Sequence, residues 1–222
     1  MPAADRVLVY TRTTGYRHAS IPAGAAALAE LAEGAGLRAE HTEDPAAFRA
    51  RSLRDCAAVV FLSTSGEVLD PEGREALTGF VASGGGYLGV HGASTTEYDW
   101  PYYGELVGAR FDGHPEIQPA VVTVEDADHP ATAHLPARWE WTDEWYGFRA
   151  NPRGAVRVLA GVDESTYRGG GMGADHPLVW CHERCGGRAL YTALGHAAES
   201  YAQPAFREHL RGALRWVTRL AN

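Results

Sequence analysis

The sequence predicts an α/β fold, a mostly parallel central sheet between helices in three layers, extended by antiparallel strands. In the first half, short apolar runs rich in β-branched residues alternate with helix patterns, as in sheets whose parallel strands are joined by crossover helices. In the second half, apolar and polar residues alternate within runs separated by long loops, which is typical of antiparallel or edge strands. The chain has 222 residues and 45% hydrophobic content, so we expect one domain over residues 1–222.

The first half contains four runs that predict parallel strands, at residues 7–11, 37–41, 57–63 and 87–90. A helix is expected to begin at Ser20 as its N-cap, with Pro22 in the first turn, and to end near Gly34. A second helix begins at Asp70-Pro71-Glu72, where an acidic cap precedes a proline, and ends at the glycines 84–86.

The second half contains three runs that predict edge or antiparallel strands, at residues 120–124, 137–145 and 155–163. The runs 177–182 and 188–192 flank a short polar segment and predict a hairpin. The chain ends in an amphipathic helix that should pack on the sheet. Its apolar face is expected to contain Phe206, Leu210, Ala213, Leu214, Val217 and Leu220.

Charge and composition exclude several classes of function. The formal net charge is −8 with scattered Lys and Arg, so no basic surface for nucleic acid or anionic lipid is expected. The N-terminus shows no signal peptide, and no apolar run of about 18 residues follows, which indicates a cytoplasmic protein without a membrane segment. The first strand is not followed by Gly-x-Gly-x-x-Gly, and the glycine-rich stretch 169–173 lacks the Lys-Ser/Thr of a phosphate loop. We interpret that stretch as a lid or insertion near the site.

Open α/β sheets bind ligands beyond the carboxyl ends of their strands, where the strand order reverses. If the first, third and fourth strands are neighbours, the loops 15–18, 64–66 and 89–93 converge there. The third loop has the form of a nucleophile elbow, a sharp turn after a strand with small residues on both sides. Its central residue is His91, which suits an acid, a base, a metal ligand or a partner of a sugar hydroxyl. The alternative is a turn histidine with only local hydrogen bonds.

Seven segments, in order over nearly the whole chain, resemble one known family. They are Gly15-Tyr16-Arg17-His18, the segment 84–91, Gly113-His114-Pro115, His129-Pro130, Asp143-Glu144-Trp145-Tyr146, the segment 176–180 and the segment 187–196. Together they identify the chain as similar to the ThuA-like (trehalose utilisation) family. The resemblance implies a flavodoxin-like core similar to class I glutamine amidotransferases, with a small-molecule site. It also implies a link to trehalose and related sugars, and sugar derivatives such as 3-keto-sugars are the expected substrates.

The sequence departs from amidotransferases at the nucleophile. Those enzymes require a cysteine at the elbow, where this chain has His91, and its three cysteines, Cys56, Cys181 and Cys185, lie elsewhere. Hydrolysis of glutamine through a thiolate is therefore not expected, because a thiolate must lie beside a base and oxyanion donors. His196 corresponds by position to the catalytic histidine of the amidotransferases.

A carboxylate could complete this chemistry. Asp143 and Glu144 lie in an aromatic run, where a carboxyl group can have a raised pKa and serve as acid or base, or only accept a hydrogen bond from a Trp or Arg. The expected catalytic residues are His91, His196, Glu144 and Asp143. The expected substrate-binding residues are Arg17, His18, Ser65, Gly66, His114, Trp145 and Tyr146. An ion pair is the alternative for Arg17, and ordinary packing is the alternative for the aromatic residues.

No cofactor is required by this scheme, although a divalent metal is compatible with it. His18, His91 and His196 would be the natural ligands if the loops meet, but no H-E-x-x-H or paired C-x-x-C spacing favours a metal. The pair Cys181 and Cys185 lacks the second half of a metal knuckle and is interpreted as structural.

These observations predict an enzyme that acts on a sugar or keto-sugar by proton transfer, giving hydrolysis, isomerisation or elimination. Two alternatives stay open: a non-catalytic sugar-binding or regulatory module, and a metal-dependent hydrolase. The expected partner is a small-molecule sugar, with no nucleic acid and no membrane. The exposed edge of the antiparallel region is compatible with a homodimer.

Overall fold

The computed structural model describes residues 4–220, which form a nine-stranded sheet in the order β2-β1-β3-β4-β11-β10-β9-β6-β7. The first five strands in this order are parallel: β2 (Arg38–Thr42), β1 (Arg6–Tyr10), β3 (Cys56–Leu62), β4 (Gly86–Val90) and β11 (Ala189–Thr192). The other four are antiparallel: β10 (Pro177–His182), β9 (Arg157–Val162), β6 (Gln118–Val124) and β7 (Arg138–Asp143). A separate small sheet pairs β5 (Phe111–Gly113) with β8 (Gly147–Phe148).

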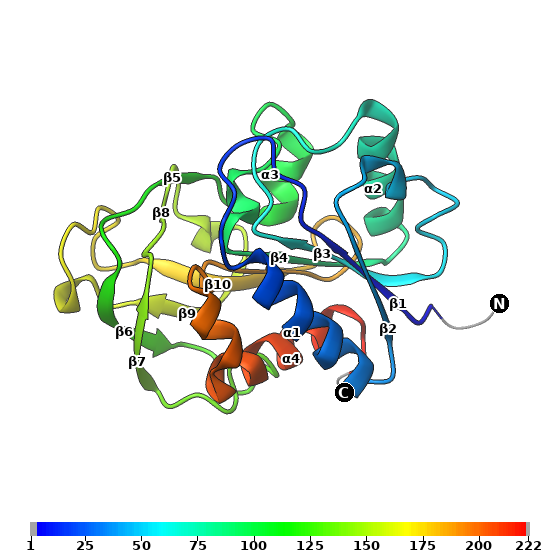
Figure 1. Cartoon of the computed structure of the whole chain (residues 1–222). Helices are drawn as coiled ribbons and strands as arrows, with labels where there is room; N and C mark the ends of the chain where they lie inside the picture. The colour runs from blue at the N-terminus through cyan, green and yellow to red at the C-terminus, as the bar shows by residue number, and fades with distance from the viewer. Residues whose placement is uncertain (1–3, 221–222) are drawn as a thin grey trace.

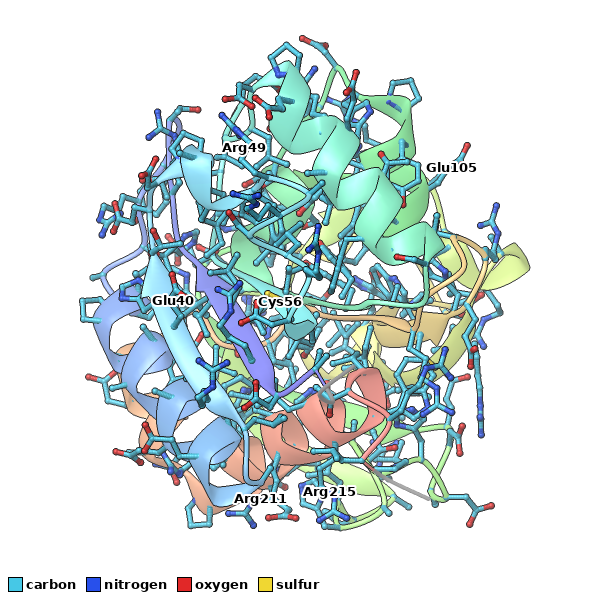
Figure 2. All side chains as sticks on the ribbon, turned by 90° about the vertical axis from the view of Figure 1, so that its right-hand side faces the viewer. Glu40, Arg49, Cys56, Glu105, Arg211 and Arg215 are labelled. Atoms are coloured by element: carbon cyan, nitrogen blue, oxygen red, sulfur yellow. The ribbon has the colours of Figure 1, made fainter. Side chains whose placement is uncertain are left out.

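Helices cover both faces of the parallel strands (Figure 1). One face carries α1 (Ile21–Gly34) and α4 (Pro204–Val217), and the other carries α2 (Pro71–Ala82) and α3 (Pro101–Val107). Figure 2, turned so that the right-hand side of Figure 1 faces the viewer, shows the same layers, with α2 above the strands and α1 and α4 below them. Five short 3₁₀ helices complete the fold: η1 (Pro45–Ala47), η2 (His91–Thr95), η3 (Pro152–Gly154), η4 (Glu164–Thr166) and η5 (Ala198–Ala202).

The strands at the centre of the sheet are buried along their whole length. Every residue of β1 and β4 is buried, and so is all of β3 except Ala57. Strands covered on both faces need apolar side chains on both, which is why their sequences are continuous apolar runs rather than alternating ones. The antiparallel strands β6 and β7 alternate in burial, as the sequence pattern predicts for strands with one wet face.

The predicted fold class is confirmed: a parallel core with helices on both faces and an antiparallel extension. The hairpin of β10 and β11 is confirmed as well, and β11 is also parallel to β4. Strand β11 thus joins the two halves of the sheet. Since both β4 and β11 end at the same edge, the residues that follow them are neighbours although they are about one hundred positions apart.

Two local predictions were wrong. Ser20 occupies the N-cap position of α1 but does not cap it, because its backbone is already helical (φ −74°, ψ −14°) and its hydroxyl has no hydrogen-bond partner among the described residues. Leu220 lies beyond α4, which ends at Val217, and is 44% exposed rather than part of the packed face. By contrast, the predicted acidic cap of α2 is confirmed, since Asp70 accepts a hydrogen bond from the backbone N–H of Gly73 at 2.7 Å.

Candidate functional site

The loops that follow β1, β3 and β4 meet at the carboxyl edge of the sheet, as the strand order β1-β3-β4 requires. The backbone N–H of Gly15 donates to the carbonyl of Ser65 at 3.3 Å, and the hydroxyl of Ser65 donates to the carbonyl of Tyr16 at 2.6 Å. The N–H of Gly66 donates to the carbonyl of Thr95 at 3.1 Å, which links the second loop to the third. Ser65 and Gly66, predicted to bind substrate, thus hold the loops of the site together.

His91 stands at a strained elbow. It follows β4 directly and has a φ of 49°, in the left-handed region that residues with a side chain rarely adopt. The hydroxyl of Tyr191 donates to the carbonyl of His91 at 2.8 Å, and the Nδ1–H of His91 donates to the carbonyl of Ala193 at 2.7 Å. Because a carbonyl only accepts, Nδ1 carries the proton of a neutral His91 and Nε2 presents its lone pair.

Three side chains from separate parts of the chain surround this Nε2 atom. His18 Nε2, from the loop after β1, is 3.1 Å away, and His196 Nδ1, from the segment after β11, is 3.3 Å away. Glu144 Oε2, from the residue after β7, lies 3.4 Å away. His18, His91, Glu144 and His196, hereafter the His–Glu centre, offer one inward-facing atom each, and these atoms all lie within 4.8 Å of one another.

The pKa values in the centre diverge according to burial and partner. Burial lowers the pKa of His18 to about 3, and the neighbouring imidazoles of His91 and His196 add to this effect, so the His18 imidazole is neutral. Burial acts to raise the pKa of Glu144, but the interactions with His196 and His91 outweigh it and hold this pKa well below its usual range. His196 Nδ1 donates a hydrogen bond to Glu144 Oε2 at 3.1 Å, and this bond raises the pKa of His196. Glu144 is therefore ionised, contrary to the raised pKa that its aromatic surroundings predict, because its histidine neighbours stabilise the charge.

Asp143 has a different environment from Glu144. Its Oδ1 accepts from the backbone N–H groups of Glu144 (2.9 Å) and His196 (3.1 Å). Its Oδ2 accepts from the N–H of Gly195 (2.9 Å) and from the indole of Trp141 (2.9 Å). With four donors on a buried carboxylate, Asp143 holds the backbone of two members of the His–Glu centre in place.

The remaining predicted residues fall into two groups. His114 lies against the centre, with Nε2 3.2 Å from Glu144 Oε1, and the ring of Tyr146 lies 4.3 Å from that of His91. Arg17 forms an ion pair with Glu43 at 2.7 Å, with about half of its side chain exposed. Trp145 is buried, donates to the carbonyl of Gln118 at 2.9 Å and contributes to the wall of the cavity beside His114.

A cavity of about 350 Å³ adjoins His114. The glycines 169–171 and Met172 form part of its wall, together with the aromatic rings of Phe148 and Tyr167. Glu164 accepts hydrogen bonds from the N–H groups of Met172 (2.8 Å) and Gly173 (3.0 Å), and so anchors this loop. The glycine-rich stretch therefore lies near the site, as predicted.

Sequence reasoning missed Tyr16. Its side chain is 69% exposed and its ring lies edge-on to that of His18, with 4.8 Å between the centroids. An aromatic residue within a polar loop at a strand end was the available signal, because such a loop has little core to pack against.

The cysteines lie away from this edge. Cys56 is at the start of β3, hence at the opposite end of the parallel strands, and is labelled in Figure 2. Burial raises the pKa values of Cys56 and Cys181 to about 12, which disfavours the reactive thiolate.

Comparison with known proteins places this geometry in a family. The family model described as ThuA, trehalose utilisation, matches residues 6–217. The chain belongs to the ThuA family. No curated protein matches the chain in sequence. The family's description supports a carbohydrate-related role, and the identification rests on nearly the whole chain.

Solved structures confirm the fold. A ThuA-like protein from Bacteroides uniformis superimposes with a TM-score of 0.82 at 24% identity, over 97% of this chain and 91% of that one. A ThuA-like protein from Parabacteroides merdae gives 0.78 at 19% identity, over 96% and 89%. A cytoplasmic protein from Salmonella typhimurium gives 0.62 at 12% identity, over 95% and 98%. Across residues 4–220 of this ThuA protein, no helix has the length and apolar character needed to cross a membrane.

Proposed function

We propose that this ThuA protein is an enzyme that acts on a sugar or keto-sugar by proton transfer between histidine and carboxylate groups. The observation that carries the proposal is the His–Glu centre, in which four titratable side chains from distant parts of the chain converge at the carboxyl edge of the sheet. Titratable groups with divergent pKa values at one site are typical of acid–base catalysis. The family's description supports a carbohydrate as the substrate.

The partly exposed members of the centre are the ones that can reach a substrate. The side chain of His196 is 19% exposed and that of Glu144 is 10% exposed, whereas His91 is fully buried. The ionised Glu144 is suited to accept a proton from a sugar hydroxyl or an α-carbon, and protonated His196 is suited to donate one. His91 and Asp143 act as positioning residues for this pair, and His114 contacts the free oxygen of Glu144.

The surroundings suit a sugar. Tyr16 offers an exposed aromatic face beside His18, on which the apolar face of a pyranose ring can stack. The cavity next to His114 has the size of a small-ligand site. The reaction should proceed without glutaminase activity, because the elbow holds His91 and the thiols of Cys56 and Cys181 are buried with raised pKa values.

Four further expectations belong to this proposal. The protein acts in the cytoplasm, binds neither nucleic acid nor membrane, and consists of one domain over residues 1–222, of which the outermost residues lie outside the described part. The strand β7 stands at one end of the strand order, which is compatible with pairing to a second copy.

The test is ligand binding followed by turnover. Trehalose, 3-keto-trehalose, a 3-keto-glucoside and glutamine are screened by thermal shift on wild type, His91→Ala and Glu144→Gln. His134→Gln is the matched control. His134 is exposed, and its side chain forms a hydrogen bond with the carbonyl of Ala205 and not with any member of the His–Glu centre. A ligand at one hundred times its dissociation constant stabilises the native state by about 2.7 kcal/mol, which is readily measured.

We expect a keto-sugar to raise the melting temperature of wild type and of His134→Gln, and to be turned over by both. It should neither stabilise His91→Ala and Glu144→Gln nor be turned over by them. Binding by all variants without turnover would point instead to a non-catalytic sugar-binding module. A shift with none of the sugars would remove the case for a carbohydrate substrate.

A further inference from the structure

The His–Glu centre brings potential metal-binding atoms of four side chains within 4.8 Å of one another. His91 Nε2 presents a lone pair, since the proton of His91 is engaged at Nδ1 with the carbonyl of Ala193. Glu144 Oε2, a carboxyl oxygen of the kind that binds metal ions, lies 3.4 Å away. His196 Nδ1 contacts both acceptors, at 3.3 and 3.1 Å, and a single N–H cannot serve both well. A cation placed between these facing nitrogen and oxygen atoms would be stabilised by all of them at once.

We propose that the His–Glu centre is a mononuclear site for a divalent transition metal, with zinc as the best match. The ligands would be His18 Nε2, His91 Nε2, His196 Nδ1 and Glu144 Oε2. Three imidazoles and one carboxylate are a nitrogen-rich donor set of the kind that zinc, copper, nickel and iron prefer, whereas magnesium and calcium prefer oxygen.

The spacing of these atoms fits one ion. Ligands about 2.0–2.1 Å from a tetrahedral zinc ion lie roughly 3.3–3.4 Å from one another. Neighbouring atoms of the centre are separated by 3.1 Å (His18 to His91), 3.3 Å (His91 to His196), 3.1 Å (His196 to Glu144) and 3.4 Å (His91 to Glu144). The other two separations are at most 4.8 Å, which leaves one side of the polyhedron wide enough for a further ligand.

Outer contacts hold the ligands in the orientation that a metal needs. The hydrogen bond from His91 Nδ1 to a backbone carbonyl fixes the tautomer with Nε2 free, as is usual for metal-bound histidine. Asp143 accepts from the backbone N–H groups of Glu144 and His196 and so holds two ligands at once. Tyr146 stacks against the ring of His91 and places its hydroxyl 3.5 Å from His18 Nε2. These contacts fix the four side chains from outside the proposed ligand sphere.

The metal site stands on these side chains alone, and only its part in a reaction rests on the proposed function. A bound ion would polarise a carbonyl or hydroxyl oxygen of a sugar, or lower the pKa of a water molecule. Proton transfer assigned above to His196 and Glu144 would then pass to other groups. His114 is the nearest candidate, because it contacts Glu144 Oε1, the carboxyl oxygen outside the proposed ligand set.

The experiment measures metal binding directly, on the full chain without a histidine tag. Protein is stripped with a chelator and titrated with Zn²⁺ by calorimetry, and with Co²⁺ by visible absorption, which reports tetrahedral nitrogen and oxygen ligation. The variants are His196→Ala and Glu144→Gln, both at partly exposed ligands. The controls are His134→Gln, outside the centre, and His114→Ala, which contacts Glu144 without being a ligand. Circular dichroism confirms that each variant is folded.

Wild type and the His134 variant should bind about one ion per chain, and the His114 variant should retain that stoichiometry. Loss of His196 or Glu144 should weaken Zn²⁺ binding by more than the ten- to hundredfold that loss of an outer contact costs. No binding by wild type, or equal binding by wild type and both folded ligand variants, would overturn the inference. The result is separable from the proposed function. Absence of metal binding together with full sugar turnover would reject the metal site and keep the enzyme, whereas tight metal binding without any sugar response would keep the metal site and reject the proposed function.

Discussion

Replacing Asp143 by asparagine tests whether that residue supports the site or performs chemistry. The carboxylate accepts four hydrogen bonds, from Trp141, Gly195, His196 and Glu144, at 2.9–3.1 Å. In either orientation, the asparagine amide turns an NH₂ group toward two of these donors, which lose their acceptor. Each hydrogen bond to a charged group contributes about 1.5–3 kcal/mol. The Asp143→Asn variant should therefore lose roughly 3–6 kcal/mol of unfolding free energy, a large part of the 5–15 kcal/mol typical of a domain.

The assay is equilibrium unfolding in urea, which gives the midpoint concentration and the slope m of unfolding free energy against urea concentration for each variant. A change of midpoint at constant m reports a change of stability. Glu144→Gln is the matched control. Its carboxylate faces the histidines of the centre rather than backbone donors, so this change should abolish activity and alter the unfolding free energy by much less. An Asp143→Asn protein as stable as wild type, or a Glu144→Gln protein that is the less stable of the two, would refute the distinction between the two carboxylates.

The remaining predictions concern acid stability, the loop junction and the substrate platform. Burial lowers the pKa of His209 to about 4, whereas an unfolded histidine has a pKa near 6.5. The neutral, buried His209 therefore contributes its full stability above pH 6.5, and this stability is lost as the pH falls toward 4. His209→Gln should show an acid loss of unfolding free energy smaller than that of wild type by about 3 kcal/mol. Gly66→Ala should destabilise by roughly 1–3 kcal/mol, because φ is +74° and the new Cβ would lie 2.3 Å from Thr14 Oγ1. Tyr16→Ala should weaken sugar binding about tenfold at unchanged stability, and Tyr16→Phe should preserve it.

Each of these has its own control. Burial also lowers the pKa of His129 to about 4, but His129 is present in both wild type and the His209 variant, so its effect cancels in the comparison. Parallel profiles of unfolding free energy against pH for the two proteins would contradict the role given to His209. Gly171→Ala meets no atom within 4 Å and should stay within about 0.5 kcal/mol of wild type. Equal sugar affinity of the Tyr16→Ala and wild-type proteins would remove Tyr16 from the binding surface.

Much of the fold follows from local patterns. Continuous apolar runs, the cap at Asp70 and the glycines 84–86 depend on interactions between residues close in sequence, and they predicted the parallel core and its helices. The elbow at His91 was predictable for the same reason, because small residues on both sides of a strand end are a local requirement of a sharp turn. Its convergence with His18 and His196 then followed from an assumed strand order.

The tertiary structure alone decided which carboxylate faces the histidines. Asp143 and Glu144 are adjacent and chemically alike, but successive residues of an extended chain point in opposite directions, and a shift of one position would exchange their roles. Asp143 ends β7, the last strand in the strand order, and Glu144 follows it. Which of the two faces the histidines depends on N–H donors more than 50 residues away at Gly195 and His196. The ionised state of Glu144 has the same origin, since no local pattern shows that two histidines stabilise its charge. Sequence determined the scaffold and the histidine elbow, and long-range packing determined the fourth member of the His–Glu centre.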